Sequence, residues 1–238
     1  MDLTLSVSAI CDIGCGKPNN EDMILLNNEM FRDGERQAVF NSKDNVVIAV
    51  ADGVGGLNKG EVASEQVLTA LRAFLNGIPD NLNADELHKS FDTYTLNTHN
   101  SLSKNTGSTL AGLFIYQGKM FRFHAGDSRI YQFRNGSLLR LTVDHSLRES
   151  GRNPNASSNI ITNSIGGGST AYIEFAEIET PLLSDDIYLL SSDGMHDLIS
   201  FDEILSALNE PNTAESLTSL AKERGGKDNI SVITIIIK

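Results

Sequence analysis

The stretch Val46-Val47-Ile48-Ala49-Val50-Ala51-Asp52-Gly53 joins six consecutive apolar residues to an aspartate and a glycine. A near-continuous apolar run of this length is typical of a strand covered on both faces in the middle of a sheet. The Asp-Gly pair predicts that the chain turns where this strand leaves the core. We therefore expect an ionisable side chain at the rim of a buried sheet.

Five further apolar runs of strand length follow along the chain. They are Thr109–Tyr116, Met120–Ala125, Ile130–Phe133, Ile187–Leu190 and Ile230–Ile237. The Asn135-Gly136 step after the third of these runs predicts a two-residue hairpin.

Helical patterns are fewer and fall in two pairs. Apolar residues at helical spacing predict one helix around Val67 and a second around Phe91. Ser200 and Glu203 form a capping-box pattern that opens a third helix, and Asn212 begins a fourth. Helix pairs that alternate with runs of strands predict an α+β fold with antiparallel sheet, rather than alternating βα units.

Composition narrows the classes of function. The 238 residues, 40% of them hydrophobic, allow a core that needs no disulfide bonds, and we expect a single domain over residues 1–238. The net charge of -12 argues against binding to nucleic acid or to anionic membranes. Two cysteines make no disulfide framework, and we find no signal peptide or membrane span. We expect a cytoplasmic monomer.

Aspartates recur at the ends of the apolar runs. Asp193-Gly194 follows Ile187–Leu190 after two serines, Asp127 follows the run that ends at Ala125, and Asp228 precedes Ile230–Ile237. If the last strand runs opposite to the others, these aspartates and Asp52 reach one rim of the core.

Carboxylates gathered at the edge of a dry core repel one another and favour uptake of a proton or a cation. Oxygen ligands without histidine or cysteine select Mg²⁺ or Mn²⁺ over Zn²⁺. Two such ions roughly 3.5–4 Å apart can share one water, lower its pKa and direct it at a phosphorus atom. The alternative reading is that each Asp-Gly pair is an ordinary turn, but this explains several such pairs at buried strands less well.

Six segments carry a resemblance to a known family. They are Asn19-Asn20-Glu21-Asp22, Val50-Ala51-Asp52-Gly53-Val54-Gly55-Gly56, Gly107-Ser108-Thr109, Ala125-Gly126-Asp127-Ser128-Arg129, Ser192-Asp193-Gly194 and Gly226-Lys227-Asp228-Asn229. In this order, from about Ser8 to Ile237, the chain resembles the type 2C metal-dependent protein phosphatases, in particular their compact bacterial members. The resemblance implies a four-layer αββα sandwich of two antiparallel sheets flanked by helix pairs.

The same resemblance implies hydrolysis of phosphoserine and phosphothreonine in proteins. It implies two Mn²⁺ or Mg²⁺ ions, with a third in some members, and a metal-bridging water or hydroxide as the nucleophile. Asp52 is similar to the carboxylate that bridges both metals, and the carbonyl of Gly53 to a ligand of one. Asp193 and Asp228 resemble ligands of the other ion.

The resemblance also implies roles for residues around the metal ligands. Glu21 and Asp22 resemble residues that hold metal-bound waters, and Asp127 with Asp197 resembles the third metal site. Lys17 stands where family members usually carry a phosphate-binding arginine. Lysine keeps the charge but lacks the planar fork, so we expect weaker phosphate binding. The alternative for Lys17 is a solvated side chain in a turn.

Two further features depart from the family pattern. His196 is a candidate proton donor because it lies between Asp193 and Asp197, and the alternative is a histidine that only packs. The polar loop at about 146–160 is a short flap-like segment. These departures leave open an alternative function: a weakly active or inactive member of the fold that serves as a regulatory binding module. In either case the expected partners are phosphorylated proteins, targets of a serine/threonine kinase.

Overall fold

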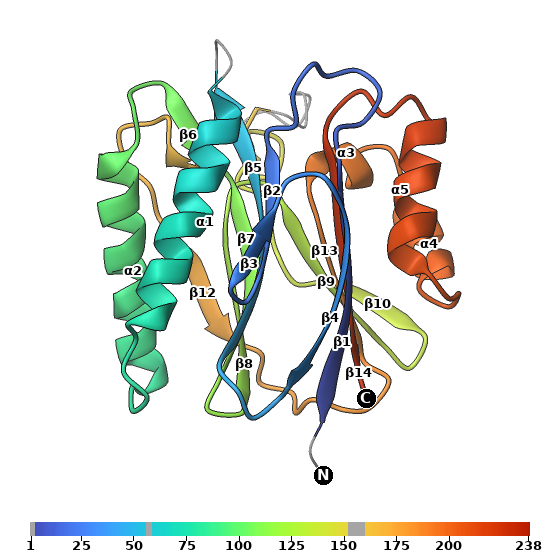
Figure 1. Ribbon diagram of the computed structural model, residues 1–238, viewed down its shortest axis with the longest axis horizontal. Coiled ribbons are helices and arrows are strands. Elements are labelled where there is room, and N and C mark those ends of the chain that lie inside the picture. Colours follow the sequence, from blue (N-terminus) through green and yellow to red (C-terminus); the bar gives the residue numbers. More distant parts are fainter. Residues whose placement is uncertain (1–2, 56–58, 152–159) are drawn as a thin grey trace.

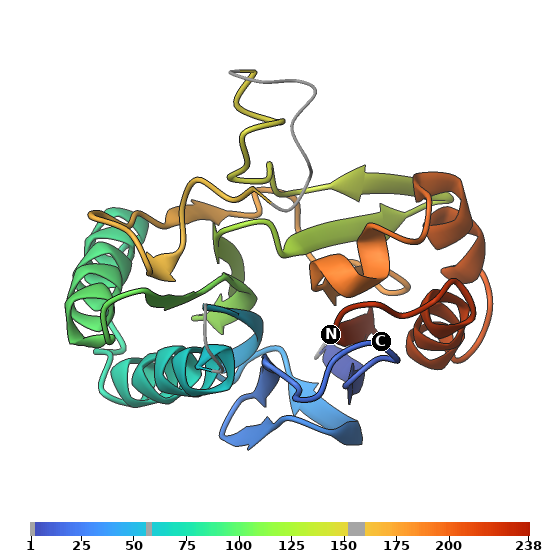
Figure 2. The ribbon, with the colours of Figure 1, turned by 90° about the horizontal axis from the view of Figure 1, so that it is seen from above.

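The computed structural model describes residues 3–55, 59–151 and 160–238, and its helices and strands form four layers (Figures 1 and 2). The strands are β1 (Thr4–Asp12), β2 (Asp22–Leu26), β3 (Glu29–Phe31), β4 (Gly34–Asn41), β5 (Val46–Gly55), β6 (Thr106–Ser108), β7 (Leu110–Tyr116), β8 (Lys119–Ala125), β9 (Arg129–Arg134), β10 (Ser137–Arg140), β11 (Ile165–Gly166), β12 (Glu174–Glu177), β13 (Ile187–Ser191) and β14 (Ile230–Ile237). The helices are α1 (Gly60–Asn76), α2 (Ala84–Ser101), α3 (Asp193–His196), α4 (Phe201–Ala207) and α5 (Thr213–Glu223).

The strands form two antiparallel sheets. A six-stranded sheet has the order β10-β9-β13-β14-β1-β4, and an eight-stranded sheet has the order β11-β6-β5-β7-β8-β12, with β2 beside β5 and β3 beside β2. Helices α1 and α2 cover the outer face of the eight-stranded sheet, and α4 and α5 cover the six-stranded one (Figure 2). The expected sandwich of two antiparallel sheets between helix pairs is confirmed.

Strand β5 shows why a continuous apolar run was needed. Val46, Ile48 and Val50 pack into the core between the two sheets, whereas Val47 and Ala49 pack toward α1 and α2. Successive side chains of a strand point to opposite faces, so both faces of β5 are buried.

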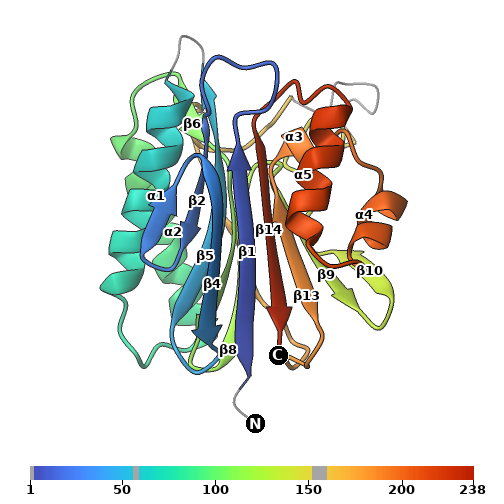
Figure 3. The ribbon, with the colours of Figure 1, turned by 45° about the vertical axis from the view of Figure 1, so that its right-hand side comes forward.

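The directions of the strands bring the strand ends that carry the candidate site residues together. The first residue of β14 lies beside the ends of β1 and β13, because β14 pairs antiparallel with both (Figure 3). In the other sheet Asp22, at the start of β2, lies opposite Asp52 in β5. Strand β14 thus runs opposite to β13, which brings Asp228 and Asp193 to the same end of this sheet.

Local predictions fared unevenly. The Asn135-Gly136 hairpin joins β9 to β10, and the Ser200 capping box opens α4. Strands β1 to β4 were absent from the predicted set, although β1 and β4 form one side of the six-stranded sheet. The larger part of the expected flap-like loop, residues 152–159, lies outside the described residues. Within the described part of the chain, every helix is too short or too polar to cross a membrane.

The layer between α1, α2 and the eight-stranded sheet centres on Phe91. Its ring lies 4.6 Å from the ring of Phe175 and 5.0 Å from that of Phe123, and the side chain is fully buried. We expect Phe91→Ala to lower the free energy of unfolding by about 3–5 kcal/mol, because it leaves a cavity in a rigid layer. Leu96→Ala on the same helix, where Leu96 is 56% exposed, should cost less than about 0.5 kcal/mol. Urea unfolding of both variants measures the difference, and equal losses would contradict this account of the core.

Candidate active site

The backbone of Asp52 is fixed by the start of β7. Its N–H donates to the hydroxyl of Thr109 at 3.0 Å, and its carbonyl accepts from the N–H of Thr109 at 2.8 Å and from the hydroxyl of Ser108 at 3.0 Å. The Thr109 hydroxyl in turn lies 2.7 Å from that of Ser128. Ser108 and Thr109, in one of the six segments that carry the family resemblance, therefore hold the backbone of the central aspartate in place.

Asp22 links the two sheets. Its Oδ2 atom accepts hydrogen bonds from Ser192, after β13, and from Ser231, in β14, both at 2.7 Å. Its Oδ1 atom is buried and has no hydrogen-bond partner among the described residues. A buried carboxylate oxygen without a donor is costly, so this position suits a cation or an ordered water.

Asp193 and Asp228 meet where α3 contacts the start of β14. A β-carbon on Gly194 would lie 1.9 Å from the carbonyl oxygen of Asn229, so only glycine allows α3 to pack this closely. A cavity of about 170 Å³ opens here, and Asp193, Asp197 and Asp228 line it. The Oδ1 atom of Asp193 is buried and lacks a partner among the described residues.

Glu21 and the Gly53 carbonyl meet at the first residue of α1. The N–H of Gly60 donates to Oε1 of Glu21 at 3.1 Å. A β-carbon on Gly60 would lie 2.4 Å from that oxygen and 2.5 Å from the Gly53 oxygen. Glycine at this position lets the helix approach both oxygens. Gly53 follows Asp52 in the chain, and Glu21 precedes Asp22, which pairs with Asp52 across β2 and β5.

The negative charges at this rim are only partly compensated. Burial, followed by repulsion from Asp22 and Asp193, raises the pKa of Asp52 well above its ordinary value. Burial, followed by repulsion from Asp127 and Asp228, does the same to the pKa of Asp193. Burial raises the pKa of Asp22 to about 6, against the opposing effect of its serine partners. Crowded oxygen ligands of this kind fit divalent hard cations.

Asp127 and Asp197 lie beside this cluster. Burial raises the pKa of Asp127 to about 7, and repulsion from Asp144 and from Asp197 adds to the shift. Asp127 also acts on the pKa values of Asp52 and Asp193. The structure thus brings these two carboxylates near the main group, at its β8–β9 side.

Lys17 supplies the positive charge at the rim. Its Nζ atom lies 2.7 Å from Oδ1 of Asp228. Burial lowers the pKa of Lys17, but the hydrogen bond to Asp228 and attraction from Asp228, Glu21 and Asp52 outweigh it and raise the pKa overall. Lys17 therefore contacts one candidate ligand, and its charge lies near three of the site carboxylates.

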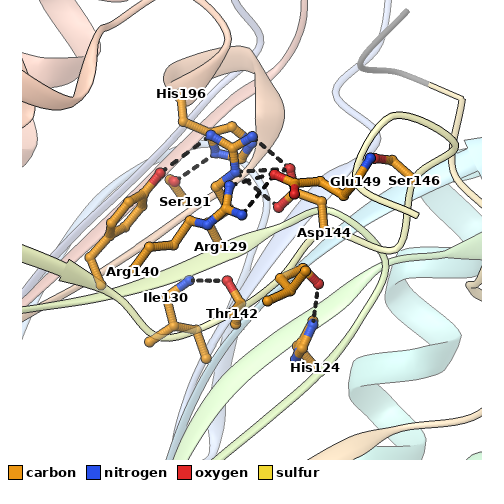
Figure 4. Close-up of polar contacts among 12 residues, drawn as sticks. His124, Arg129, Ile130, Arg140, Thr142, Asp144, Ser146, Glu149, Ser191 and His196 are labelled. Carbon is orange, nitrogen blue, oxygen red and sulfur yellow. Dashed lines mark hydrogen bonds and ion pairs between the residues drawn. The ribbon is translucent and has the colours of Figure 1, made fainter. Parts of the chain in front are cut away.

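His196 faces a different environment. Its Nδ1 atom lies 2.9 Å from the hydroxyl of Ser191, and the ring is buried beside the Arg129–Asp144 ion pair (Figure 4). Burial, with the nearby charges of Arg129 and Arg140, lowers its pKa well below the ordinary value. An imidazole kept neutral has no imidazolium proton to donate, so the structure supports the packing alternative for His196.

Sequence reasoning missed the serines that support Asp22, whereas the place of Asn229 beside Asp228 did indicate a supporting role. Asn229 accepts from the N–H of Glu21 at 2.8 Å and donates to the carbonyls of Ile13 and Asn19 at 2.9 and 3.0 Å. One buried amide thus closes the loop that carries Lys17. Its place directly after a candidate metal ligand was the available signal, since a ligand is commonly oriented by neighbouring hydrogen bonds.

A second group of metal-ligating side chains lies apart from the aspartates. Within the described ranges, His124, His145 and Glu174 have ligand atoms that all lie within 4.8 Å of one another. Nδ1 of His145 accepts from the N–H of Gly126 at 3.2 Å and lies 2.8 Å from Nδ2 of Asn163. The proton of His145 is therefore on Nε2, facing Glu174, and this tautomer is not a metal ligand at Nε2. The group joins the chain after β10 to β8 and β12.

Comparisons with known proteins identify the family and the fold. The model of the family described as protein phosphatase 2C matches residues 27–224. The chain is 30% identical to the protein phosphatase PhpP of Streptococcus pneumoniae, over 97% of each chain. It is similar to the solved serine/threonine phosphatase of S. agalactiae, with 26% identity, a TM-score of 0.81, and coverage of 98% of this chain and 100% of that one.

A second solved structure is the catalytic domain of the serine/threonine protein phosphatase PstP in complex with two manganese ions. Its identity to this chain is 28% and the TM-score is 0.75, over 99% of each chain. The extent of the family match, together with the shared sandwich and the carboxylate rim, establishes that the chain belongs to the protein phosphatase 2C family.

Proposed function

We propose that the carboxylate rim at the ends of the two sheets is the site where this phosphatase binds two Mn²⁺ or Mg²⁺ ions and hydrolyses phosphoserine and phosphothreonine in proteins. Family membership makes the chain a metal-dependent serine/threonine protein phosphatase, and the alternative of a silent binding module is not favoured. The observation that best supports this location of the metal site is that Asp22 and Asp193 each have a buried carboxylate oxygen with no partner among the described residues. The raised pKa values of Asp52 and Asp193 agree with it.

The proposed ligands divide by position. Asp52 would contact both ions, the Gly53 carbonyl would contact one, and Asp193 with Asp228 would contact the other. Glu21 and Asp22 would act through water, and Asp127 with Asp197 would form a third, looser site. When bound, the ions supply positive charge and lower the pKa of a water that attacks phosphorus. The hydrogen bonds from Ser192 and Ser231 both go to Oδ2 of Asp22. They leave Oδ1, which has no partner among the described residues, for a water or an ion.

Lys17 is the proposed phosphate-binding side chain. It is half-buried, and its contact with Asp228 places it at the ligand cluster, so it can attract a phosphate dianion toward the rim. A lysine acts as a point charge without the two parallel donors of arginine, which limits how firmly it orients the phosphate.

The partners we propose are phosphoproteins, specifically targets of a serine/threonine kinase, and the enzyme would act as a cytoplasmic monomer. Both cysteines, buried Cys11 and exposed Cys15, are free, which agrees with a reducing compartment. The net charge of -12 opposes binding to nucleic acid or anionic lipid.

Asp52→Asn should lower hydrolysis of p-nitrophenyl phosphate in Mn²⁺ by at least about 100-fold, because it removes charge from the centre of the ligand set. Asp92→Asn, an exposed carboxylate on α2, is the matched control and should leave the rate unchanged. Steady-state kinetics decide the matter, and full activity of Asp52→Asn would refute the assigned centre.

Removal of metal should separate the phosphatase from a silent module. We expect EDTA to abolish dephosphorylation of a phosphothreonine peptide and Mn²⁺ to restore it. Thermal unfolding should follow the same order, with a higher Tm in Mn²⁺, because the ions relieve repulsion among the buried carboxylates. If EDTA changes neither the Tm nor the activity, the protein does not have the proposed site.

Lys17→Met should change two quantities in opposite directions. The KM for a phosphopeptide should rise about tenfold or more, because a charged donor to phosphate is lost. The Mn²⁺ concentration needed for half-maximal Tm shift should fall, because Asp228 loses a competing cation. Lys17→Arg should lower KM, and Lys119→Met at the far end of β8 is the control. A rise in KM with no change in Mn²⁺ affinity would place Lys17 away from Asp228 in solution.

A further inference from the structure

A polar cavity begins two residues beyond Asp52. It has a volume of about 370 Å³, and its lining includes Val54, Asn105, Thr162, Thr170 and the backbone of residues 166–168. The side chains that line it carry no charge within the described ranges. The glycines leave backbone without side chains on one wall, which suits close approach of another extended chain.

A second cavity of about 400 Å³ continues from the first. The two share Asn105 and residues 166–168, and the second reaches His99, Ser103 and Lys104 at the end of α2. We call the two together the β6 trough, because they flank the segment that leads into β6.

Strand register fixes how the β6 trough runs from the site. Val54 pairs with Gly107, and Gly107 pairs with Gly166, so the three residues lie in one line across β5, β6 and β11. Lys104 lies in the turn before β6, where the N–H of Thr106 donates to the carbonyl of Ser103 at 3.2 Å. It lines the second cavity, whereas Val54 lines the first.

Lys104 is the charged side chain of the β6 trough within the described residues, in a protein with a net charge of -12. His99 uses its Nδ1 atom to accept from the N–H of Gly166 at 2.9 Å, which fixes the glycine wall in place. Lys104 is exposed and forms no ion pair with a carboxylate of the described residues, so its charge can distinguish an acidic peptide from a basic one.

We propose that the β6 trough binds the peptide segment beside the phosphorylated residue of a protein substrate. Uncharged residues would lie between Val54 and the glycines, and an acidic residue would lie at Lys104. This inference rests on the proposed function, because it takes Asp52 to lie at the reacting phosphate. It assigns substrate selection to a surface that is distinct from the metal ligands and from Lys17.

The test uses the full chain in Mn²⁺ with phosphothreonine peptides built on an alanine background. Each peptide carries one glutamate or one lysine at a single position, up to six residues on either side. We expect one position, on one side, at which the glutamate peptide exceeds the lysine peptide in kcat/KM by about two- to fivefold. Lys104→Met should bring that ratio near one, and Lys104→Glu should invert it.

Lys89→Glu is the matched charge reversal, since Lys89 is exposed in the middle of α2, away from both cavities. It should keep the native ratio. Two results would overturn the proposal. One is a native ratio of glutamate-peptide to lysine-peptide kcat/KM that is near one at every position, and the other is a ratio that Lys89→Glu inverts as strongly as Lys104→Glu. Failure of the proposed function looks different: the native enzyme would then hydrolyse neither p-nitrophenyl phosphate nor any of the peptides.

Discussion

Repulsion among carboxylates at the sheet ends is the constraint on which the rest of the site depends. Asp22, Asp52 and Asp193 each have a raised pKa, first because of burial and then because of one another or their neighbours. Such a group cannot persist unless the surrounding backbone holds it rigidly. The hydrogen bonds of Thr109 to Asp52, and of two serines to Asp22, meet that need. The sandwich thus keeps charges close that would otherwise separate.

These same bonds explain how the two sheets act as one scaffold. Ser192 and Ser231 belong to the six-stranded sheet or its continuation, and Asp22 belongs to the eight-stranded one. A single carboxylate oxygen therefore joins the rims of two layers whose facing sides pack through an apolar core. Stability gained from the core offsets the electrostatic cost at its edge, as is common where a site must be preorganised.

Much of this could be predicted from sequence, but not the serines that support Asp22. Asp52 and Asp193 were identified because each follows an apolar run whose length marks a buried strand. Strand β1 was missed although its inward residues alternate regularly, because serines on its other face broke the continuous pattern used for the central strands. The serine bonds to Asp22 join positions 170 and 209 residues apart. No local pattern encodes partners at that separation, so only the fold reveals them.

The position of Lys17 follows from the same electrostatic argument. A lysine beside Asp228 partly neutralises the rim, yet it also contacts a carboxylate that we assign to a metal. One cation therefore cannot serve both Asp228 and the phosphate equally well. In the proposed site, divalent ions on the carboxylates would weaken the attraction that holds Lys17 on Asp228 and would free its charge for an incoming phosphate. Binding of metal and binding of substrate would then favour one another through this one side chain.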